Sequence, residues 1–361
     1  MKKILKIGSA FIGIIVGAGF ASGQEILQYF TSFGYIGIIG AIVSTALFAY
    51  LGMMLTRLGS RMRATSHKEA IYKVSGKYLG IIVDAIIIFT LFGVGVVMIA
   101  GAGSIFSQQF GLSSIVGIIF MSVLVIVTMM LNVDRVVAVI GSITPFLILA
   151  VILVSIYSIL AMDNSFAALN PVAQESPSAL SHWLLSAINY VSFNIAVGAS
   201  MALLMGGAEE DERIASLGGL VGGLGIGVLI VLSNLAVFSN VDVVASFDMP
   251  MLKIVDDISP VLGFIYSFIL FGMIFNTAVS MFYSFGARFT EVGTMKQRLF
   301  TTVTIVIAFG LSFVGFTDLV AWFYPTIGWL GTFLILALVI APFRMSSAKK
   351  KEEQEQLRKA N

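Results

Sequence analysis

The sequence contains no cysteine, and its two histidines, His67 and His182, lie far apart. Without cysteine the chain can form no disulfide, no thiolate metal site and no cysteine nucleophile. Two separated histidines do not form a histidine metal site either, so we expect no metal other than a transported ion. We also expect no cofactor.

Charge is scarce as well. Charged residues make up 11% of the chain and hydrophobic residues 58%, whereas a soluble domain has about 25% charged residues. Uncharged runs long enough for a membrane span of about 20 residues recur along the chain. The short alternating pattern of a membrane barrel is missing. The composition therefore predicts an all-α integral membrane protein whose partner is the lipid bilayer, with no nucleic-acid partner and no evident obligate protein partner.

Ten membrane spans are predicted, and their orientation follows from lysine and arginine. The spans cover residues 5–33, 35–56, 79–107, 112–131, 136–161, 180–207, 215–239, 260–288, 297–315 and 318–343. All but one of the 21 lysines and arginines fall on the side of the two termini, and only Lys253 falls on the other. Because basic loops stay in the cytoplasm, we expect a plasma-membrane protein with both termini cytoplasmic.

The ten spans divide into two sets of five, which would enter the membrane from opposite sides as an inverted repeat. The predicted parts are a first repeat at 1–161, an extracellular linker at 162–179, a second repeat at 180–343 and a cytoplasmic tail at 344–361. Spans 3 and 8 occupy matching positions, and each follows a polar segment, 60–78 or 241–259. Spans 1 and 6 also match, because each is predicted to be interrupted.

The interruption in span 1 is predicted from three glycines, Gly17, Gly19 and Gly23. Each weakens a helix by about 0.5–1 kcal/mol relative to alanine. In span 6 the signal is polar, with Asn189, Ser192 and Asn194 at membrane depth and a glycine shortly after. The alternatives are close helix packing at the glycines and hydrogen bonds between helices at the asparagines.

Paired interrupted helices in two halves of a chain are typical of a transporter site at the bilayer midplane. The N-terminal end of a half-helix offers free N–H groups to a carboxylate, and its C-terminal end offers carbonyls to an ammonium group or Na⁺. A molecule with both groups on one carbon fits these two ends. The pattern therefore predicts a small zwitterionic substrate such as an α-amino acid.

The plan of five plus five spans resembles the LeuT-type fold of the amino acid–polyamine–organocation superfamily. The string Val16-Gly17-Ala18-Gly19 is similar to the first-helix motif of the neurotransmitter:sodium symporters. The longer string from Gly17 to Glu25 is similar to bacterial YkvI-type amino acid permeases.

This resemblance implies the site residues. The candidate substrate-binding residues are Gly17, Ala18, Gly19, Phe20, Gln24, Phe92, Asn189, Phe193, Asn194 and Gly198. The candidate Na⁺-binding residues are Gly13, Val16, Met273, Asn276 and Thr277. Phe20 stands where those symporters have a carboxamide that binds a first sodium ion, which argues against that first sodium site here.

Two acidic residues have open roles at this stage. Glu25 would face an outer vestibule as a gate, a proton acceptor or a partner for a cationic substrate, or it would lie at the wet end of a short half-helix. Asp84 is expected to be a helix-start acid or part of an inner ion pair.

The function predicted is Na⁺-coupled import of a small amino acid or related amine, with spans 1, 2, 6 and 7 rocking against spans 3, 4, 8 and 9. The alternatives are proton coupling through Glu25 and a sensor or channel on the same fold. The spans carry no ATP-binding motif and no paired acids or Ser/His groups, so we do not expect an enzyme.

Overall fold

The computed structural model describes residues 1–64, 67–130, 144–291 and 293–336, and within them every regular element is helical. The helices of the first half are α1 (Lys2–Ile15), α2 (Ala18–Ser22), α3 (Gln24–Tyr29), η1 (Thr31–Phe33), α4 (Tyr35–Met62), α5 (His67–Phe110), α6 (Ser114–Met130) and α8 (Thr144–Leu160). Those that follow are α9 (Phe166–Glu175), α10 (Trp183–Gly207), α11 (Glu212–Phe238), α12 (Val241–Val244), α13 (Pro250–Ile258), α14 (Pro260–Phe289), α15 (Met295–Ser312) and a last helix at Phe316–Leu336.

Within these residues, each of the ten predicted span ranges holds helix. Five helices are long and apolar enough to cross a membrane, and α10 makes a sixth if its bent halves count as one span. Parts of the ranges 136–161 and 318–343, and the whole tail 344–361, lie outside the described residues. The division into two repeats stays a prediction.

Two connecting segments differ from expectation. The linker 162–179 holds a short helix, α9, which begins at a Ser165 cap and contains Pro171. The polar segment 60–78 is not a separate element, because α4 continues to Met62 and α5 begins at His67. Its counterpart 241–259 does form short helices, α12 and α13.

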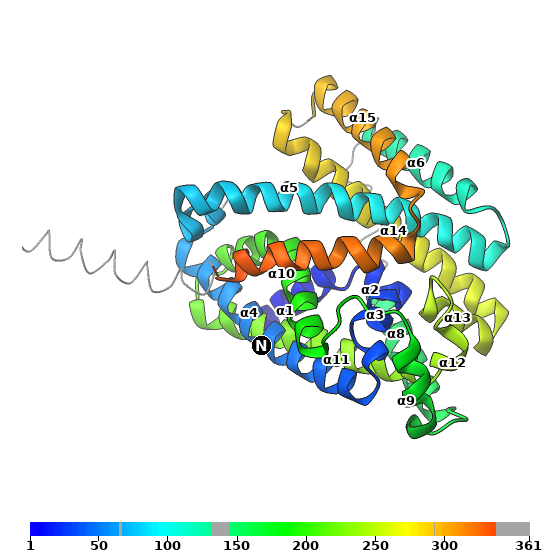
Figure 1. The fold of residues 1–361 in the computed structure, drawn as a ribbon. Coiled ribbons are helices and arrows are strands. Elements are labelled where there is room, and N and C mark those ends of the chain that lie inside the picture. Colours follow the sequence, from blue (N-terminus) through cyan, green and yellow to red (C-terminus); the bar gives the residue numbers. More distant parts are fainter. Residues whose placement is uncertain (65–66, 131–143, 292, 337–361) are drawn as a thin grey trace, which may run out of the picture.

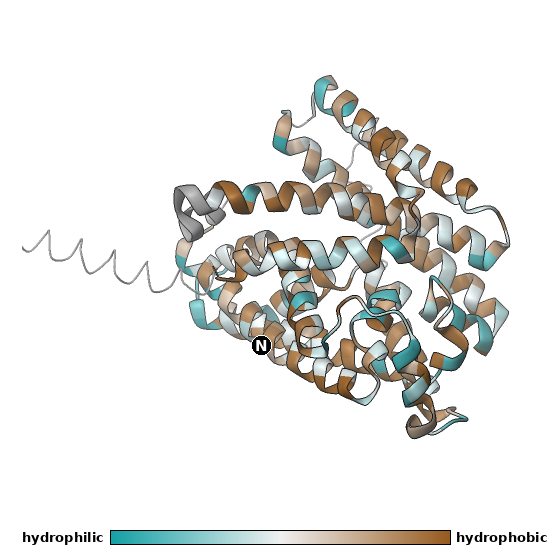
Figure 2. Ribbon diagram, in the orientation of Figure 1, coloured by the Kyte–Doolittle hydropathy of each residue, from teal (hydrophilic) through white to brown (hydrophobic). Residues whose placement is uncertain are grey.

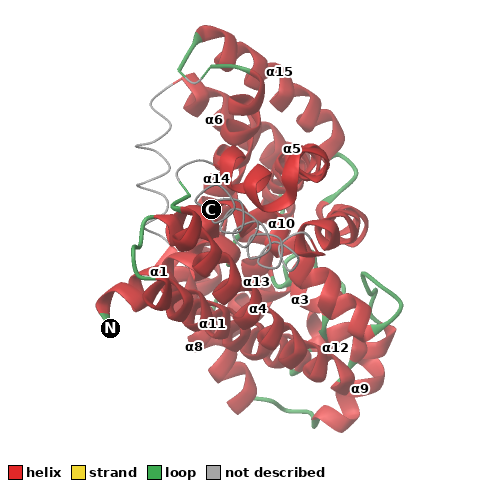
Figure 3. Cartoon of the chain, turned by 90° about the vertical axis from the view of Figure 1, so that its left-hand side faces the viewer, coloured by secondary structure: helices red, strands yellow, loops and turns green. Residues whose placement is uncertain are grey.

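The helices form two groups that lie side by side in both views of the chain (Figures 1 and 3). One group, here called the bundle, consists of α1, α4, α10 and α11, which pack on one another. The other, here called the scaffold, consists of α5, α6, α14 and α15. These are the predicted spans 1, 2, 6 and 7 and spans 3, 4, 8 and 9. The groups meet where α10 packs on α5 and α2 packs on α14.

Glycines let the bundle helices approach backbone to backbone. A Cβ atom added at Gly52 of α4 would lie 2.6 Å from the carbonyl oxygen of Gly219 on α11. One added at Gly59 would lie 2.0 Å from the carbonyl oxygen of Leu203 on α10, and one at Gly206 would lie 2.0 Å from that of Thr56. Real Cβ atoms do not come this close, so small residues are required along the seams, as is typical of helices packed in membranes.

Figure 2 shows apolar residues along the long helices and hydrophilic residues gathered at helix ends and connections. One end of the molecule, here called the basic end, is joined by ion pairs. These pairs are Lys3–Glu209, Arg57–Glu212, Arg61–Glu212, Arg63–Glu210 and Arg288–Asp84. The last confirms the ion pair expected for Asp84. Lys3 and the backbone N–H groups that follow Glu209 hold the pKa of that carboxyl below its ordinary value.

Candidate functional site

The first predicted interruption is present, and it lies at Val16 and Gly17. Helix α1 closes with a hydrogen bond from the Val16 N–H to the Ile12 carbonyl, 2.8 Å long, and α2 begins two residues later. Gly17 is extended, and a Cβ added to it would meet only a carbonyl oxygen at 4.0 Å. The N–H groups of the first three residues of α2 have no acceptor among the described residues. The break thus leaves free donors beside open space.

A second interruption follows at Gly23, which is left-handed at φ +82. Its N–H donates to the Phe20 carbonyl, and the Ser22 hydroxyl donates to the Gly19 carbonyl at 2.6 Å. A Cβ added at Gly23 would lie 2.7 Å from Cγ of Met251 on α13. Glycine is therefore required here both by backbone conformation and by space. Helix α2 is left with five residues, and α3 starts in a new direction.

Glu25 lies inside the protein, which argues against the wet helix end predicted for it. Its role as a gate, a proton acceptor or a partner for a cationic substrate stays a prediction. Its side chain is buried, and the residue is 4% exposed. One carboxylate oxygen, Oε1, lies against Gly19, only 1.8 Å from where a Cβ of that residue would be. The other, Oε2, accepts a 3.2 Å hydrogen bond from the Tyr190 hydroxyl. The left-handed turn at Gly23 lets α3 bring this carboxylate back to α2.

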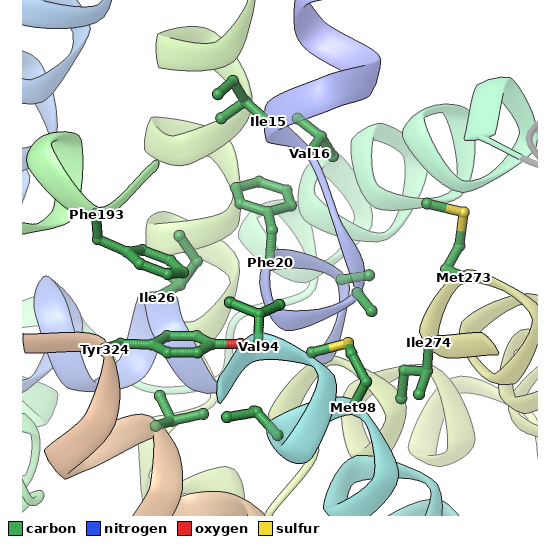
Figure 4. Packing of buried hydrophobic residues seen from close by; sticks show 14 of the residues in the cluster. Ile15, Val16, Phe20, Ile26, Val94, Met98, Phe193, Met273, Ile274 and Tyr324 are labelled. Carbon is green, nitrogen blue, oxygen red and sulfur yellow. The ribbon is translucent and has the colours of Figure 1, made fainter. Parts of the chain in front are cut away.

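Aromatic residues surround this carboxylate. The ring of Tyr190 contacts those of Tyr29 and Phe30, with centroids 5.2 and 5.1 Å apart. On the other side Tyr324 stacks on Phe193 at 4.2 Å, and its hydroxyl lies 3.3 Å from where a Cβ of Gly19 would be. Figure 4 shows the Tyr324 hydroxyl pointing away from Phe193 toward Phe20 and Val94.

Sequence reasoning missed these three tyrosines as site residues. One signal was available. Tyr29 follows Glu25 by four residues, which places both on one face of a helix. Nothing in the sequence links that face to Tyr190 or to Tyr324.

The two asparagines of α10 are held by the protein. Asn189 accepts a hydrogen bond from the Tyr29 hydroxyl at 3.3 Å and donates one to the Pro325 carbonyl at 3.0 Å. Asn194 donates to the carbonyl of Tyr190 in its own helix, at 2.9 Å. Asn189 therefore forms the hydrogen bond between helices that was the alternative to an interruption.

The interruption of α10 lies slightly beyond its predicted place. The helix runs on through residues 189–198 and bends by 54° between Ala199 and Met201. The polar side chains at 189, 192 and 194 bond within or between helices, so the helical backbone is kept there. Gly198 still lies at the first interruption, because a Cβ added to it would be 2.7 Å from Ile15, the last residue of α1.

The predicted ion-binding residues lie on two helices, α1 and α14, that run in opposite directions. Tyr266 on α14 donates a 2.7 Å hydrogen bond to the Ala21 carbonyl, which fixes α14 beside α2. From there α14 runs toward the basic end, where it ends with Arg288, while α1 runs away from that end. Asn276 lies ten residues, or about 15 Å, along α14, and Gly13 lies eight residues back along the first span.

The predicted ion-binding side chains differ in whether their polar atoms have hydrogen-bond partners. Val16 and Met273 are both buried, and Figure 4 shows Val16 next to Phe20 and Met273 on the neighbouring α14. Oδ1 of Asn276 is buried and has no donor among the described residues. A buried carbonyl oxygen without a donor is costly unless a cation or water meets it.

No family model matches the chain. Over 350 residues it is 28% identical to YkvI, an uncharacterised membrane protein of Bacillus subtilis strain 168, with 94% of this chain and 97% of YkvI covered. It is 24% identical to the uncharacterised protein YyaD of the same strain, with 92% and 94% covered. The resemblance noted for the string from Gly17 to Glu25 agrees with the first of these relatives.

Solved structures decide the fold. The chain matches MhsT in complex with L-phenylalanine with a TM-score of 0.59 at 16% identity, covering 93% of this chain and 87% of MhsT. It matches inward-facing Mhp1 with a TM-score of 0.61 at 14% identity, covering 85% and 69%. A mutant of the Eremococcus coleocola manganese transporter gives 0.61 at 13% identity, covering 94% and 78%. The chain has the LeuT-type fold.

Within this LeuT-type fold, most of the predicted residues gather around α2. Phe20 is buried there, and Gln24 is buried with an Oε1 that lacks a donor among the described residues. Phe193 reaches the same region through its stacking on Tyr324. Phe92 differs from these residues. It is half-buried and packs on Phe285 of the scaffold, with ring centroids 5.7 Å apart.

Proposed function

We propose that the chain is a secondary active transporter that imports a small amino acid or related amine together with Na⁺. The observation that carries this proposal is the break at Val16 and Gly17. It leaves free N–H groups at the start of α2, and a Cβ added at Gly17 would meet only one atom, at 4.0 Å. Such unwound backbone at membrane depth is tolerated where it borders a cavity or protein, and it offers hydrogen bonds to a substrate.

Two further observations support the proposal. The buried Oδ1 of Asn276 has no donor among the described residues, and oxygen ligands are those that hard cations prefer. Among proteins of the same fold, MhsT is described in complex with L-phenylalanine, while other neighbours are described as manganese transporters. The first favours an amino acid, and the cluster of aromatic residues around α2 favours an organic ligand.

The mechanism we propose is alternating access by rocking of the bundle against the scaffold. We place the basic end in the cytoplasm of a plasma-membrane protein, following the positive-inside rule. At the opposite end, Asp248 accepts hydrogen bonds from Ser104 of α5 at 2.7 Å and from Thr317 at 2.5 Å. These bonds hold the segment before α13 over α2 and support a state that is closed to the outside.

Uptake into proteoliposomes tests the proposal. Accumulation of radiolabelled amino acids and amines is measured with and without an inward Na⁺ gradient at fixed pH. We expect Na⁺-dependent accumulation. Asn276→Ala removes one oxygen ligand of the ion, and the loss of a contact about as strong as a hydrogen bond should raise the Na⁺ concentration for half-maximal uptake by about tenfold or more. Asn164→Ala, an exposed asparagine, serves as the matched control. Substrate binding without accumulation would show a sensor and contradict the proposal.

A second candidate, proton coupling through Glu25, is favoured by one observation. Glu25 is buried at membrane depth, and no lysine or arginine pairs with it among the described residues. A lone buried carboxylate is stable only when a proton or another cation accompanies it. Uptake that ignores Na⁺, follows an inward proton gradient and disappears in Glu25→Gln would establish this candidate in place of Na⁺ coupling.

A further inference from the structure

The position of Glu25 constrains the substrate itself. The proposed function gives the start of α2 to a carboxylate of the substrate. In the structure, the carboxylate of Glu25 already lies against that turn, with Oε1 in the space of a Gly19 side chain. Its second oxygen is held by the Tyr190 hydroxyl. The protein thus has a carboxylate of its own beside the turn that the proposed function gives to the substrate carboxylate.

A substrate that brings a carboxylate of its own would meet like charge here whenever Glu25 is ionised. Two charges within about 4–6 Å of each other change an ionic equilibrium by about 10- to 1000-fold, unfavourably for like charges and favourably for opposite ones. Burial keeps this effect strong, because water screens it little, and Glu25 is 4% exposed. The neighbouring side chains do not offset it, since they are tyrosines and asparagine rather than bases.

The aromatic residues around Glu25 suit a cation. Tyr29, Tyr190 and Tyr324 lie on three different elements, and their rings are packed on other aromatic rings. Their hydroxyl oxygens lie at this carboxylate or next to it, and a hydroxyl oxygen accepts hydrogen bonds from an ammonium group. A carboxylate within a group of such rings is the arrangement expected for a protonated amine.

We infer that the substrate is a protonated organic amine without a carboxylate, whose ammonium group binds beside the Glu25 carboxylate and Gly19. This inference rests on the proposed function and narrows its substrate class. Glu25 is then the specificity-determining residue, and Tyr190, which donates to it, is a positioning residue. The side chain of the amine would extend toward the break at Gly17.

The test compares amino acids with their decarboxylated amines, which differ only in the group at issue. The pairs are L-leucine and isopentylamine, L-phenylalanine and phenethylamine, and L-arginine and agmatine. Binding to the full chain in detergent is measured by calorimetry at fixed pH and fixed Na⁺. In at least one pair the amine should bind at least about tenfold tighter than the amino acid.

Two variants connect that preference to Glu25. Glu25→Gln should weaken amine binding by about tenfold or more and leave amino acid binding equal or tighter, whereas Glu175→Gln, the same change at an exposed site, should alter neither. If Glu25→Gln does not fold, Glu25→Asp keeps the charge and should keep the preference for the amine. Tyr190→Phe should weaken binding of the amine while the amine still binds more tightly than the amino acid.

The outcomes separate this inference from the proposed function. Tighter binding of the amino acid in every pair, or an amine preference that survives in Glu25→Gln, would overturn the inference and leave the transporter proposal standing. Binding of the amino acid accompanied by proton uptake at Glu25 would overturn it in favour of proton coupling. Binding of neither member of any pair would count against the proposed function itself.

Discussion

Replacing Gly19 by alanine places a methyl group where the Glu25 carboxylate lies. The new carbon would be 1.8 Å from Oε1, 2.8 Å from Cδ of the same side chain and 3.3 Å from the Tyr324 hydroxyl. Ordinary contact begins at 3.4 Å, so the carboxylate must move by about 1.6 Å. A shift of that size breaks the 3.2 Å hydrogen bond from Tyr190.

The cost can be estimated from these two changes. A hydrogen bond to a charged group is worth about 1.5–3 kcal/mol, and its loss inside the membrane is not repaid by water. Alanine is better than glycine inside a helix by about 0.5–1 kcal/mol, which offsets part of the loss because Gly19 lies within α2. The variant should therefore be less stable by about 1–2 kcal/mol, or about 2–8 °C in melting temperature for a large domain.

Thermal unfolding of the detergent-solubilised protein measures this effect. Gly17→Ser is the control, because a Cβ at Gly17 meets only one atom at 4.0 Å and serine is at least as good a helix N-cap as glycine. A second control combines Gly19→Ala with Glu25→Ala, and this pair should be no less stable than Glu25→Ala alone, since the clash is gone. An unchanged or higher melting temperature for Gly19→Ala would refute the placement of Glu25 against α2.

Three other predictions follow from local geometry. Gly23→Ala should destabilise the protein by about 1–2 kcal/mol from its left-handed backbone alone, and more from the contact with Met251, as read from thermal unfolding. In a double-mutant cycle, Asp84→Asn and Arg288→Gln should show a coupling of about 1–3 kcal/mol, since both side chains are mostly buried; independent effects would argue against the ion pair. The lowered pKa of Glu209 means that its stabilising contribution is present above the ordinary value of 4.5 and is lost as the pH falls toward the lowered value. The hydrogen-exchange protection factors of residues 208–212, which correct for the intrinsic pH dependence of exchange, should thus fall in acid, and Glu209→Gln should remove that fall.

The fold could be predicted from the sequence because membrane burial leaves a strong signal. Uncharged runs gave the helices, and glycine gave the interruption of the first span at Gly17. The exact ends of the helices were harder to predict, since α5 begins at His67 within a segment rich in polar residues. The bend of α10 was placed too early, because Asn189 and Asn194 find hydrogen-bond partners that the sequence does not reveal.

The site was predicted only in part for a related reason. Residues near each other along the chain, such as Gly17 and Gly19, can be grouped from the sequence itself. The environment of Glu25 depends on the turn at Gly23 and on Tyr190 and Tyr324, which approach from distant segments. A pattern of residue types shows which groups are polar, but it does not show which of them share one space.

The glycine seams of the bundle have a consequence for how fast such a molecule could change state. With α4 touching α10 and α11 backbone to backbone at Gly52, Gly59 and Gly206, these seams leave little room for a side chain to shift. If the bundle rocks as proposed, it should move as one rigid unit, and the change should be taken up at the contacts of α10 with α5 and of α2 with α14. A methyl group added in a seam should then loosen the bundle and slow transport without touching the residues proposed to bind substrate.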